Sequence, residues 1–531
     1  MNMFLESFVE EANMLSSEGI KWTPKGREGP VVSKFYPCNC PVDAMARFEM
    51  LNMTSPTGYF GCTFCDHKGV FLNKVKFPLP GEVEVKQKVN DPDDQHTQRE
   101  ETIRITVPQH QVRTDEGIKQ AMIAASSSGT SIKGVKGQSA LMNLRHFDLA
   151  RGFSTDDLHP IFLGLVEHHT SLLLGSTGEP YYIGAPDMLK IINNRLFSIK
   201  TPSIITRKQH GLGDKPPWKG SEWRNWIWYF VILCLIDLLR YPQHFVQHLA
   251  LLSNAIFLLS SDSISEADLY EAERCLRLYG ELFQKYFGPE NMRFNVHVVV
   301  DHLVPCVRNW GPVFGHSTFA FESKNRSLTS KITSPTGVIR QVVNRYMLEA
   351  LVESAPFRTD VSERVEMEID RILHGKPIEK CERVGDALLF NKNIVRKPSN
   401  EERALLEERD IRCDAMELFD KMTIDGMECR TSDATYEDNR SDNSVIYVKN
   451  DIFGVVKTIA LVSVNNRQEC CLFVQSFEVE SPVMGAQHVA RIVEKGPLTL
   501  VYPKEIRNLA IKCKICDREY IMPMANHVEI D

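Results

Sequence analysis

The fold is decided by the stretch Val31-Val32-Ser33-Lys34-Phe35-Tyr36 and the segment Cys38-Asn39-Cys40-Pro41-Val42-Asp43 that follows it. The first part favours a β-strand, and the second ends in the carboxylate of Asp43. β-Branched and aromatic residues predominate in the first part, and the second part reads as a turn. Upstream, apolar residues recur at helical spacing and predict a helix over 4–16 that ends near Gly19. We therefore expect a helix, then a strand, then Asp43 at the strand end.

Three further motifs follow Asp43 along the chain: Gly61-Cys62-Thr63-Phe64-Cys65, then Asp156-Asp157-Leu158-His159, then a run from His297 to Glu322 that includes His302. Each is weak alone. A single Cys-x-x-Cys is more often structural than functional, and a strand-end Asp is more often a turn residue than a catalyst. A lone His is more often an ordinary polar group than a ligand. The specific signal is their order and spacing.

Length and composition set broad limits. A chain of 531 residues predicts two or three domains, and 43% hydrophobic with 25% charged residues is ordinary for a globular protein. The net charge of −7 argues against a uniformly basic surface but allows a local basic groove. The most apolar stretch, 226–239, is too short to span a bilayer and predicts a buried helix. With no secretory signal expected, the 14 cysteines indicate a reduced, intracellular protein.

The hydrophobic period changes along the chain. Residues 71–112 predict a loop-rich excursion with short strands, and 114–125 a short helix. From 157 to about 287 the pattern is almost wholly helical, and 343–372 adds a further helix. Residues 373–442 are charged and uneven, which favours a partly helical linker with a disordered end near 431–443. Alternation from 444 to 503 predicts a small β domain.

In this order the motifs resemble the second half of an RNase H-like DDE transposase of the CACTA/Mirage/Chapaev type, a group related to the V(D)J recombinase. Trp218-Lys219-Gly220-Ser221-Glu222-Trp223 is similar to the signature of that family's helical insertion. The resemblance implies an α/β plus α fold. Its parts would be a partial RNase H-like core over 1–155, a helical insertion over 156–295, a segment over 296–372 that closes the core, the linker over 373–442, and a small C-terminal β domain over 443–531.

The resemblance also implies a separate role for each motif. Asp43 would be the second and Glu322 the third catalytic carboxylate, holding Mg²⁺ or Mn²⁺ for DNA strand transfer, because hard cations prefer carboxylates. Asp156 would mark the insertion or cap a helix. His159 is a weaker candidate that contacts a phosphate or orients Glu322.

Cys62, Cys65, His297 and His302 would make a structural Cys₂His₂ zinc centre in such an enzyme. Five residues on an α-helix rotate by about 500°, which leaves two histidines so spaced about 140° apart. The pair therefore needs a helix end or a kink between them. Ordinary polar roles on a helix are the alternative for the histidines.

The family's first catalytic Asp lies on an earlier strand, which we do not expect here because a helix and one strand take up nearly all of the 42 residues before Asp43. Glu6, Glu10 and Glu11 lie on the expected first helix and do not replace it. We therefore expect an N-terminally incomplete core with little or no strand transfer. Three hypotheses follow: a transposase-derived protein, active or remnant; a domesticated, non-enzymatic nuclear protein that binds DNA or protein through the same zinc-containing fold; and a helical scaffold with a β module.

DNA is the expected partner of a nuclear protein of this type, with no membrane and no small-molecule substrate; a homo-oligomer is left open. Phosphate contacts would come from basic residues among small and polar ones, with a solvated surface as the alternative. These are Lys133, Lys136, Lys324, Arg326 and Lys331. The tryptophans of 218–228 favour a core over base stacking. Cys513 and Cys516 have no matching second pair.

Overall fold

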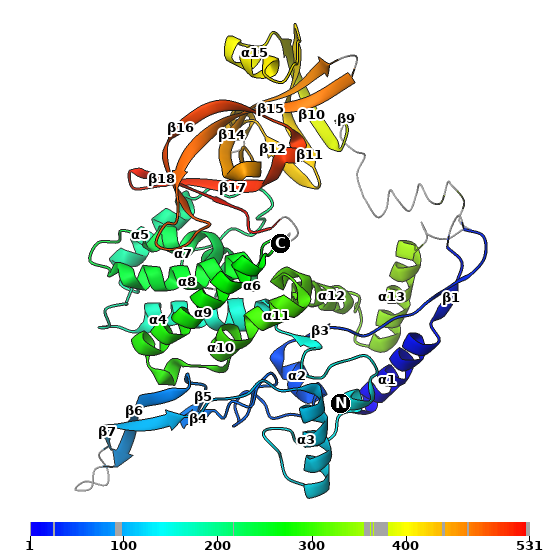
Figure 1. Cartoon of the computed structure of the whole chain (residues 1–531), viewed down its shortest axis with the longest axis vertical. Helices are drawn as coiled ribbons and strands as arrows, with labels where there is room; N and C mark the ends of the chain where they lie inside the picture. The colour runs from blue at the N-terminus through cyan, green and yellow to red at the C-terminus, as the bar shows by residue number, and fades with distance from the viewer. Residues whose placement is uncertain are drawn as a thin grey trace. The chain divides into compact units, whose positions relative to one another are not determined.

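A computed structural model describes the chain except residues 1, 25–26, 91–97, 216, 355–361, 363–364, 366–380, 438–440, 465–466 and 527–531. The fold mixes helices and strands and divides into two compact units, each built from two separate stretches of chain. The first unit comprises 1–161 and 284–378, and the second comprises 162–283 and 379–531 (Figure 1).

Helices in the N-terminal part of the first unit pack around one hydrophobic cluster. Phe48, Leu51, Ile118 and Met122 are almost fully buried in it. The helices that supply it are α1 Asn2–Ser17, α2 Ala44–Met50, α3 Asp115–Ser128 and the 3₁₀ turn η1 Ala140–Asn143. The helix expected over 4–16 is confirmed. So is the one expected over 114–125, which begins after Thr114, whose hydroxyl accepts a hydrogen bond from the Gly117 N–H.

The strands described in this unit form only two-stranded sheets. The pairs are β1 Ile20–Trp22 with β2 Val31–Ser33, β3 Cys40–Pro41 with β8 Phe153–Ser154, β4 Val70–Leu72 with β5 Lys74–Lys76, and β6 Gly81–Asn90 with β7 Gln98–Val107. The strand expected over 31–36 is wrong beyond Ser33, because β2 pairs only with the three residues of β1. The excursion over 71–112 contains a hairpin whose two strands have ten residues each, longer than the short strands expected.

The pair β3–β8 positions the motifs. It is parallel, with Cys40 opposite Phe153 and Pro41 opposite Ser154, and the Cys40 N–H donates to the Gly152 carbonyl oxygen at 2.7 Å. Parallel strands end at the same edge, so the residues that follow them lie close together. Asp43 begins α2 just after β3, and Asp156 follows β8.

The remaining helices of the first unit come from its C-terminal stretch. They are η4 Pro289–Asn291, α10 Phe294–His297, η5 Val298–His302, α11 Leu303–Trp310, η6 Val313–His316, α12 Phe319–Ser330 and α13 Val338–Ser354. The helix expected over 343–372 is confirmed to Ser354, and most of its remainder lies outside the described residues.

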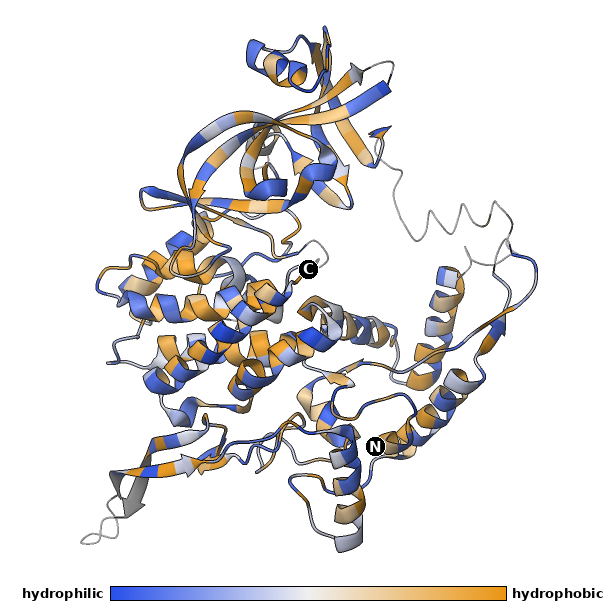
Figure 2. Ribbon diagram, in the orientation of Figure 1, coloured by the Kyte–Doolittle hydropathy of each residue, from blue (hydrophilic) through white to orange (hydrophobic). Residues whose placement is uncertain are grey.

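The second unit contains the helices of the expected insertion. These are α4 Glu167–Gly175, α5 Pro186–Ser198, α6 Gly220–Asn225, η3 Trp226–Phe230, α7 Val231–Leu235 and α8 Gln243–Leu259. Two further helices, η2 Leu158–Val166 and α9 Glu266–Phe287, contain the points at which the chain passes between the units. Trp218, Trp223, Trp226 and Trp228 are buried, as a core role requires. Figure 2 shows how strongly hydrophobic residues concentrate in α7 and α8.

A six-stranded antiparallel barrel forms the other half of this unit. Its strands follow the order β13 Val445–Val448, β17 Ile506–Ile515, β18 Arg518–Pro523, β16 Ala490–Val501, β15 Arg467–Glu480 and β14 Ile452–Val464, and β14 closes on β13. The barrel packs on the helices, since the His488 ring stacks on Phe257 with centroids 4.1 Å apart. The hydroxyl of Tyr229 accepts from the Ala525 N–H at 3.0 Å.

The expected linker over 373–442 is wrong for residues 381–437. Strands β9 Cys381–Val384, β10 Ala387–Arg396, β11 Met416–Ile424 and β12 Met427–Arg430 extend the barrel sheet from β14, with helices α15 Asn400–Glu407 and α16 Ser432–Glu437 between strands. Charged residues occupy the half-exposed positions of β11, which hid its buried positions, such as Met416 and Phe419, from the sequence pattern. No described helix is long and apolar enough to cross a membrane.

Candidate metal centre and carboxylate cluster

Cys62, Cys65, His297 and His302 come together in the first unit, and all four are buried. Cys62 Sγ lies 3.5 Å from His302 Nε2, and Cys65 Sγ lies 3.3 Å from His297 Nε2. The two Nε2 atoms are 3.2 Å apart. A tetrahedral zinc ion with bonds of about 2.0–2.1 Å to nitrogen and about 2.3 Å to sulfur places its ligands about 3.3–3.8 Å apart. The four donor atoms therefore fit a single metal ion.

A π-helical turn explains how both histidines face the cysteines. Between α10 and α11 the chain forms η5, whose hydrogen bonds span five residues in place of four. Residues five apart then lie one above the other, as His297 and His302 do. The helix irregularity that the sequence requires is thus present, and α-helical spacing alone would not bring these ligands together.

The loop that holds the two cysteines is fixed by Arg113. Its Nε donates to the carbonyl oxygens of Cys62 at 3.1 Å and of Cys65 at 2.9 Å. Its Nη2 donates to the carbonyl oxygen of Lys133 at 2.7 Å. Gly61 begins the motif because a Cβ atom there would lie 2.5 Å from the carbonyl oxygen of Ser55. No spacing rule connects Arg113 to a Cys-x-x-Cys motif 48 residues away, so the sequence does not predict this role.

Asp301 supports one histidine of the cluster. The Nδ1 atom of His297 lies 2.7 Å from Asp301 Oδ2, one helical turn along the chain. Carboxylates often orient metal-bound histidines in this way. Asp301 lies between the two histidines and was not among the residues predicted from the sequence, although its i,i+4 spacing from His297 is a signal that could have found it.

The acid–base properties of the cluster favour cation binding. Burial opposes ionisation of the Cys62 thiol, but a hydrogen bond from Cys65 and the charges of His302 and His297 hold its pKa well below the usual value. Donating that hydrogen bond to Cys62 raises the pKa of Cys65. Burial would lower the pKa of His297, yet the Cys62 charge and the bond to Asp301 raise it to about 9. A buried thiolate beside imidazoles is a site that a metal dication can neutralise.

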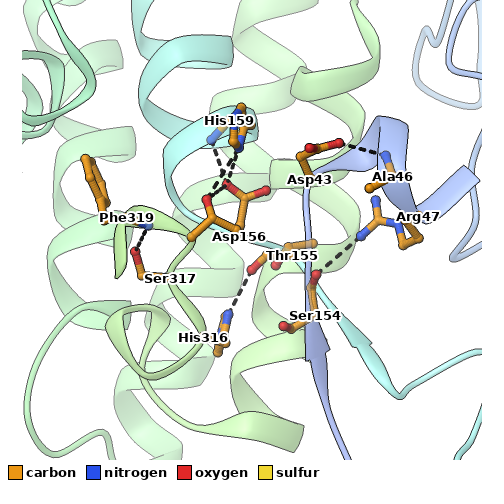
Figure 3. Close-up of polar contacts among 11 residues, drawn as sticks. Asp43, Ala46, Arg47, Ser154, Thr155, Asp156, His159, His316, Ser317 and Phe319 are labelled. Carbon is orange, nitrogen blue, oxygen red and sulfur yellow. Dashed lines mark hydrogen bonds and ion pairs between the residues drawn. The ribbon is translucent and has the colours of Figure 1, made fainter. Parts of the chain in front are cut away.

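A second polar group surrounds Asp156 where β3 and β8 end (Figure 3). Its Oδ1 atom accepts from the His159 N–H at 2.7 Å and from the Thr318 hydroxyl at 3.0 Å, and it lies 3.0 Å from His159 Nδ1. Asp156 thus caps the helix that begins at Leu158, as expected. Asp43 caps α2 by accepting from the Ala46 N–H at 2.8 Å.

Asp43 and Glu322 both act on His159. The hydrogen bond to Asp156 raises the pKa of His159 above its usual value, burial opposes the rise, and the charges of Asp43 and Glu322 add to it. Glu322 lies in the first turn of α12 and is exposed. The three carboxylates do not form a group with ligand atoms in mutual reach; the two such groups among the described residues both lie beside Cys65.

Arg47 lies between the two polar groups and is 3% exposed. Its Nη1 donates to the Ser154 carbonyl oxygen at 3.3 Å, and its guanidinium lies 4.2 Å from the centre of the Phe64 ring. Burial lowers the pKa of Arg47, while the charges of Cys62 and Asp156 oppose that shift. A buried cation here balances thiolate on one side and carboxylate on the other. No sequence pattern marks Arg47.

Most of the expected DNA-binding residues are in ion pairs. Lys133 Nζ is 2.5 Å from Asp66 Oδ2, Lys331 Nζ is 2.7 Å from Glu349 Oε2, and Lys324 Nζ is 3.7 Å from Glu349 Oε1. Lys136 and Arg326 are exposed, and neither has a salt bridge to a described residue. Cys513 is buried and Cys516 exposed, and no metal-holding group forms around them in the described part of the second unit.

Comparison with known proteins returns no match: no family model, no curated protein and no solved structure is similar to the chain at a significant level.

Proposed function

We propose that this protein is a transposase-derived, nuclear DNA-binding protein of the RNase H-like DDE type, with a structural zinc ion held by Cys62, Cys65, His297 and His302. The observation that carries the proposal is the convergence of motifs far apart in sequence. Four metal-ligand atoms from two distant segments meet at tetrahedral spacing. The charges of Asp43 and Glu322 reach the same histidine, His159. The sequence resemblance assigns all of these positions to one constellation.

Zinc at this centre would act as a cross-link. It would tie the Cys62–Cys65 loop to the helices that carry His297 and His302, which lead through α11 towards α12. Four protein ligands leave no position for a substrate, which is typical of a structural ion. The chemistry that zinc supplies is thus stabilisation of the fold, while Arg113 and Asp301 keep its ligands in place.

The arrangement of the carboxylates favours a protein that binds DNA without catalysing strand transfer. Two-metal catalysis needs ligands that hold both ions about 3.5–4 Å apart. Asp43 and Asp156 instead cap helices, and these two residues with Glu322 do not form a ligand group. Among the described residues before Asp43, strands β1 and β2 contain no Asp or Glu. A domesticated, non-enzymatic role in binding DNA or protein is therefore the alternative to an impaired transposase.

Duplex DNA binding by the full chain tests the proposal. We expect sequence-tolerant binding whose affinity falls steeply between about 50 mM and 200 mM salt, because each phosphate contact releases counterions. Fluorescence anisotropy with two unrelated duplexes measures it. An affinity for DNA that does not change with salt, or no binding at low salt, contradicts the DNA-binding role. The hypothesis of a helical scaffold with a β module would then be favoured.

A further inference from the structure

His67 lies two residues beyond Cys65 and outside the four-ligand cluster. It is 1% exposed, and neither of its ring nitrogens has a hydrogen-bond partner among the described residues. Buried polar side chains are nearly always satisfied, by protein, water or an ion. Two unpartnered nitrogens on one buried ring therefore point to a ligand.

A short antiparallel contact brings His110 opposite His67. The Arg113 N–H donates to the Phe64 carbonyl oxygen at 2.8 Å, and the Asp66 N–H donates to the Gln111 carbonyl oxygen at 3.0 Å. The next pair in this register is His67 and His110. Their rings stack with centroids 4.7 Å apart and planes 9° from parallel. The backbone thus holds two imidazoles side by side.

His110 and Asp301 complete the group. His110 Nε2 lies 3.5 Å from Asp301 Oδ2, and the buried Nδ1 atom of His110 has no hydrogen-bond partner within the described chain. Potential ligand atoms of His67, His110, His297 and Asp301 all lie within 4.8 Å of one another. His297 is already used, because its Nε2 faces Cys65 and its Nδ1 faces Asp301. A carboxylate has about four lone-pair positions, so Asp301 can hold His297 and still bind an ion.

We propose that His67, His110 and Asp301 form a second metal site for a divalent first-row transition metal, next to the Cys₂His₂ centre and sharing Asp301 with it. Two imidazoles and one carboxylate suit Zn²⁺, Co²⁺ or Fe²⁺ and disfavour Mg²⁺, which prefers oxygen ligands. Three protein ligands leave at least one position for water. The side chains of His110 and Asp301 are 15% and 23% exposed, so solvent reaches the site. This second site rests on the proposed function in one respect: it lies beside the proposed zinc centre and shares Asp301 with it.

Cobalt titration of the metal-free full chain tests this site. We expect about two equivalents of Co²⁺ to bind, one with the intense near-ultraviolet absorption of thiolate-bound cobalt and one with visible bands only. His110→Gln should bind about one equivalent and keep the thiolate absorption, which also reports that the first unit is folded. His146→Gln, at an exposed position of the same unit, should behave as the unmodified chain.

Each outcome decides the question. Uptake of one equivalent by the unmodified chain, or of two by His110→Gln, overturns the second site. Loss of the thiolate absorption in His110→Gln also overturns it, because His110 would then support the first centre. An unmodified chain without any thiolate–cobalt absorption contradicts the Cys₂His₂ centre itself, so failure of the proposed function and failure of this inference are distinguishable. His67→Gln repeats the test from the other imidazole.

Discussion

The Nδ1 atom of His297 lies 2.7 Å from the Oδ2 atom of Asp301, and the Nε2 atom of the same ring lies 3.3 Å from Cys65 Sγ. The imidazole therefore has a carboxylate at one nitrogen and a thiol at the other. A hydrogen bond to the carboxylate fixes the ring orientation and makes the other nitrogen a better ligand. This relationship makes Asp301 the residue whose removal should weaken the metal centre while all four ligands remain.

Asp301→Asn should lower the affinity of the Cys₂His₂ centre for metal by about 10–100-fold, the usual effect of losing such a partner. Competition with a chelator, followed by the thiolate–cobalt absorption, measures this centre alone. Glu116→Gln, at an exposed position of α3, is the matched control and should leave the affinity unchanged. An unchanged affinity in Asp301→Asn would show that the hydrogen bond does not tune the ligand.

The metal should also stabilise the first unit. The purified protein should contain zinc, and Cys62→Ser or His302→Ala should lose the equivalent bound at this centre, because structural zinc sites use four protein ligands. Structural zinc contributes on the order of 10 kcal/mol, so we expect a large drop in the unfolding temperature of this unit. Calorimetry with metal analysis measures both quantities.

Cys38→Ser is the control for that experiment, since Cys38 is an exposed cysteine of the same unit. It should retain zinc and its unfolding temperature. A Cys62→Ser/Cys65→Ser double variant that keeps as much zinc as the unmodified chain would remove this site as the zinc centre.

The sequence predicted the ligands of this centre better than the framework around them. The family resemblance implied Cys62, Cys65, His297 and His302 as one ligand set, and the structure brings their ligand atoms together. Arg47, Arg113 and His67 carry no sequence signal, since each acts through contacts that only the folded chain creates. The π-helical turn was required by the ligand spacing, although no residue pattern specifies it.

The same contrast holds for the fold. The helical periods of 4–16 and 157–287 predicted helices correctly because the period is carried by residues close together in the sequence. The strand expected over 31–36 was overextended, since β-propensity says nothing about whether a partner strand exists. Strands β9 to β12 were missed because their charged residues break the alternation. Burial of β11 also depends on β14, which pairs with it and lies later in the sequence.

The basic residues should differ in their effects on DNA affinity. Arg326→Ala and Lys136→Ala should weaken binding more than Lys331→Ala, because Lys331 is paired with Glu349. Each lost phosphate contact should reduce the slope of log affinity against log salt by about one. Anisotropy titrations at several salt concentrations measure both effects. A greater loss in Lys331→Ala would mean that the ion pair with Glu349 opens on binding DNA.

The stability contributed by His159 should depend on pH. Its pKa in the folded protein is raised above 6.5, chiefly by the hydrogen bond to Asp156. A raised pKa stabilises the fold fully below the unfolded value, and this contribution is lost as pH rises through the folded value. His159→Gln should therefore lower the unfolding temperature by about 1–3 °C more at pH 6 than at pH 9, a small effect because the ring is partly exposed.

Asp156→Asn provides the matched control for His159, because asparagine caps a helix as well as aspartate but carries no charge. In that background the pH dependence of the His159→Gln effect should largely disappear. Differential scanning fluorimetry across this pH range measures all three variants. An effect of His159→Gln that grows with rising pH would contradict the direction of the shift.

The last prediction concerns catalysis: the chain alone should show no Mg²⁺- or Mn²⁺-dependent strand transfer or nicking on any DNA end. In the DDE mechanism a carboxylate must bridge two ions, and its loss removes several kcal/mol of transition-state stabilisation. Asp43 accepts a hydrogen bond from α2, Asp156 accepts three polar contacts at one oxygen, and Glu322 is exposed on α12. Ligand atoms of Asp43, Asp156 and Glu322 do not come within mutual reach as a metal-binding group among the described residues. Assays of supercoiled plasmid with each metal test this directly. Activity that Asp43→Ala and Glu322→Ala both abolish, and that Glu116→Gln leaves intact, would show that a carboxylate from outside this cluster completes the metal site.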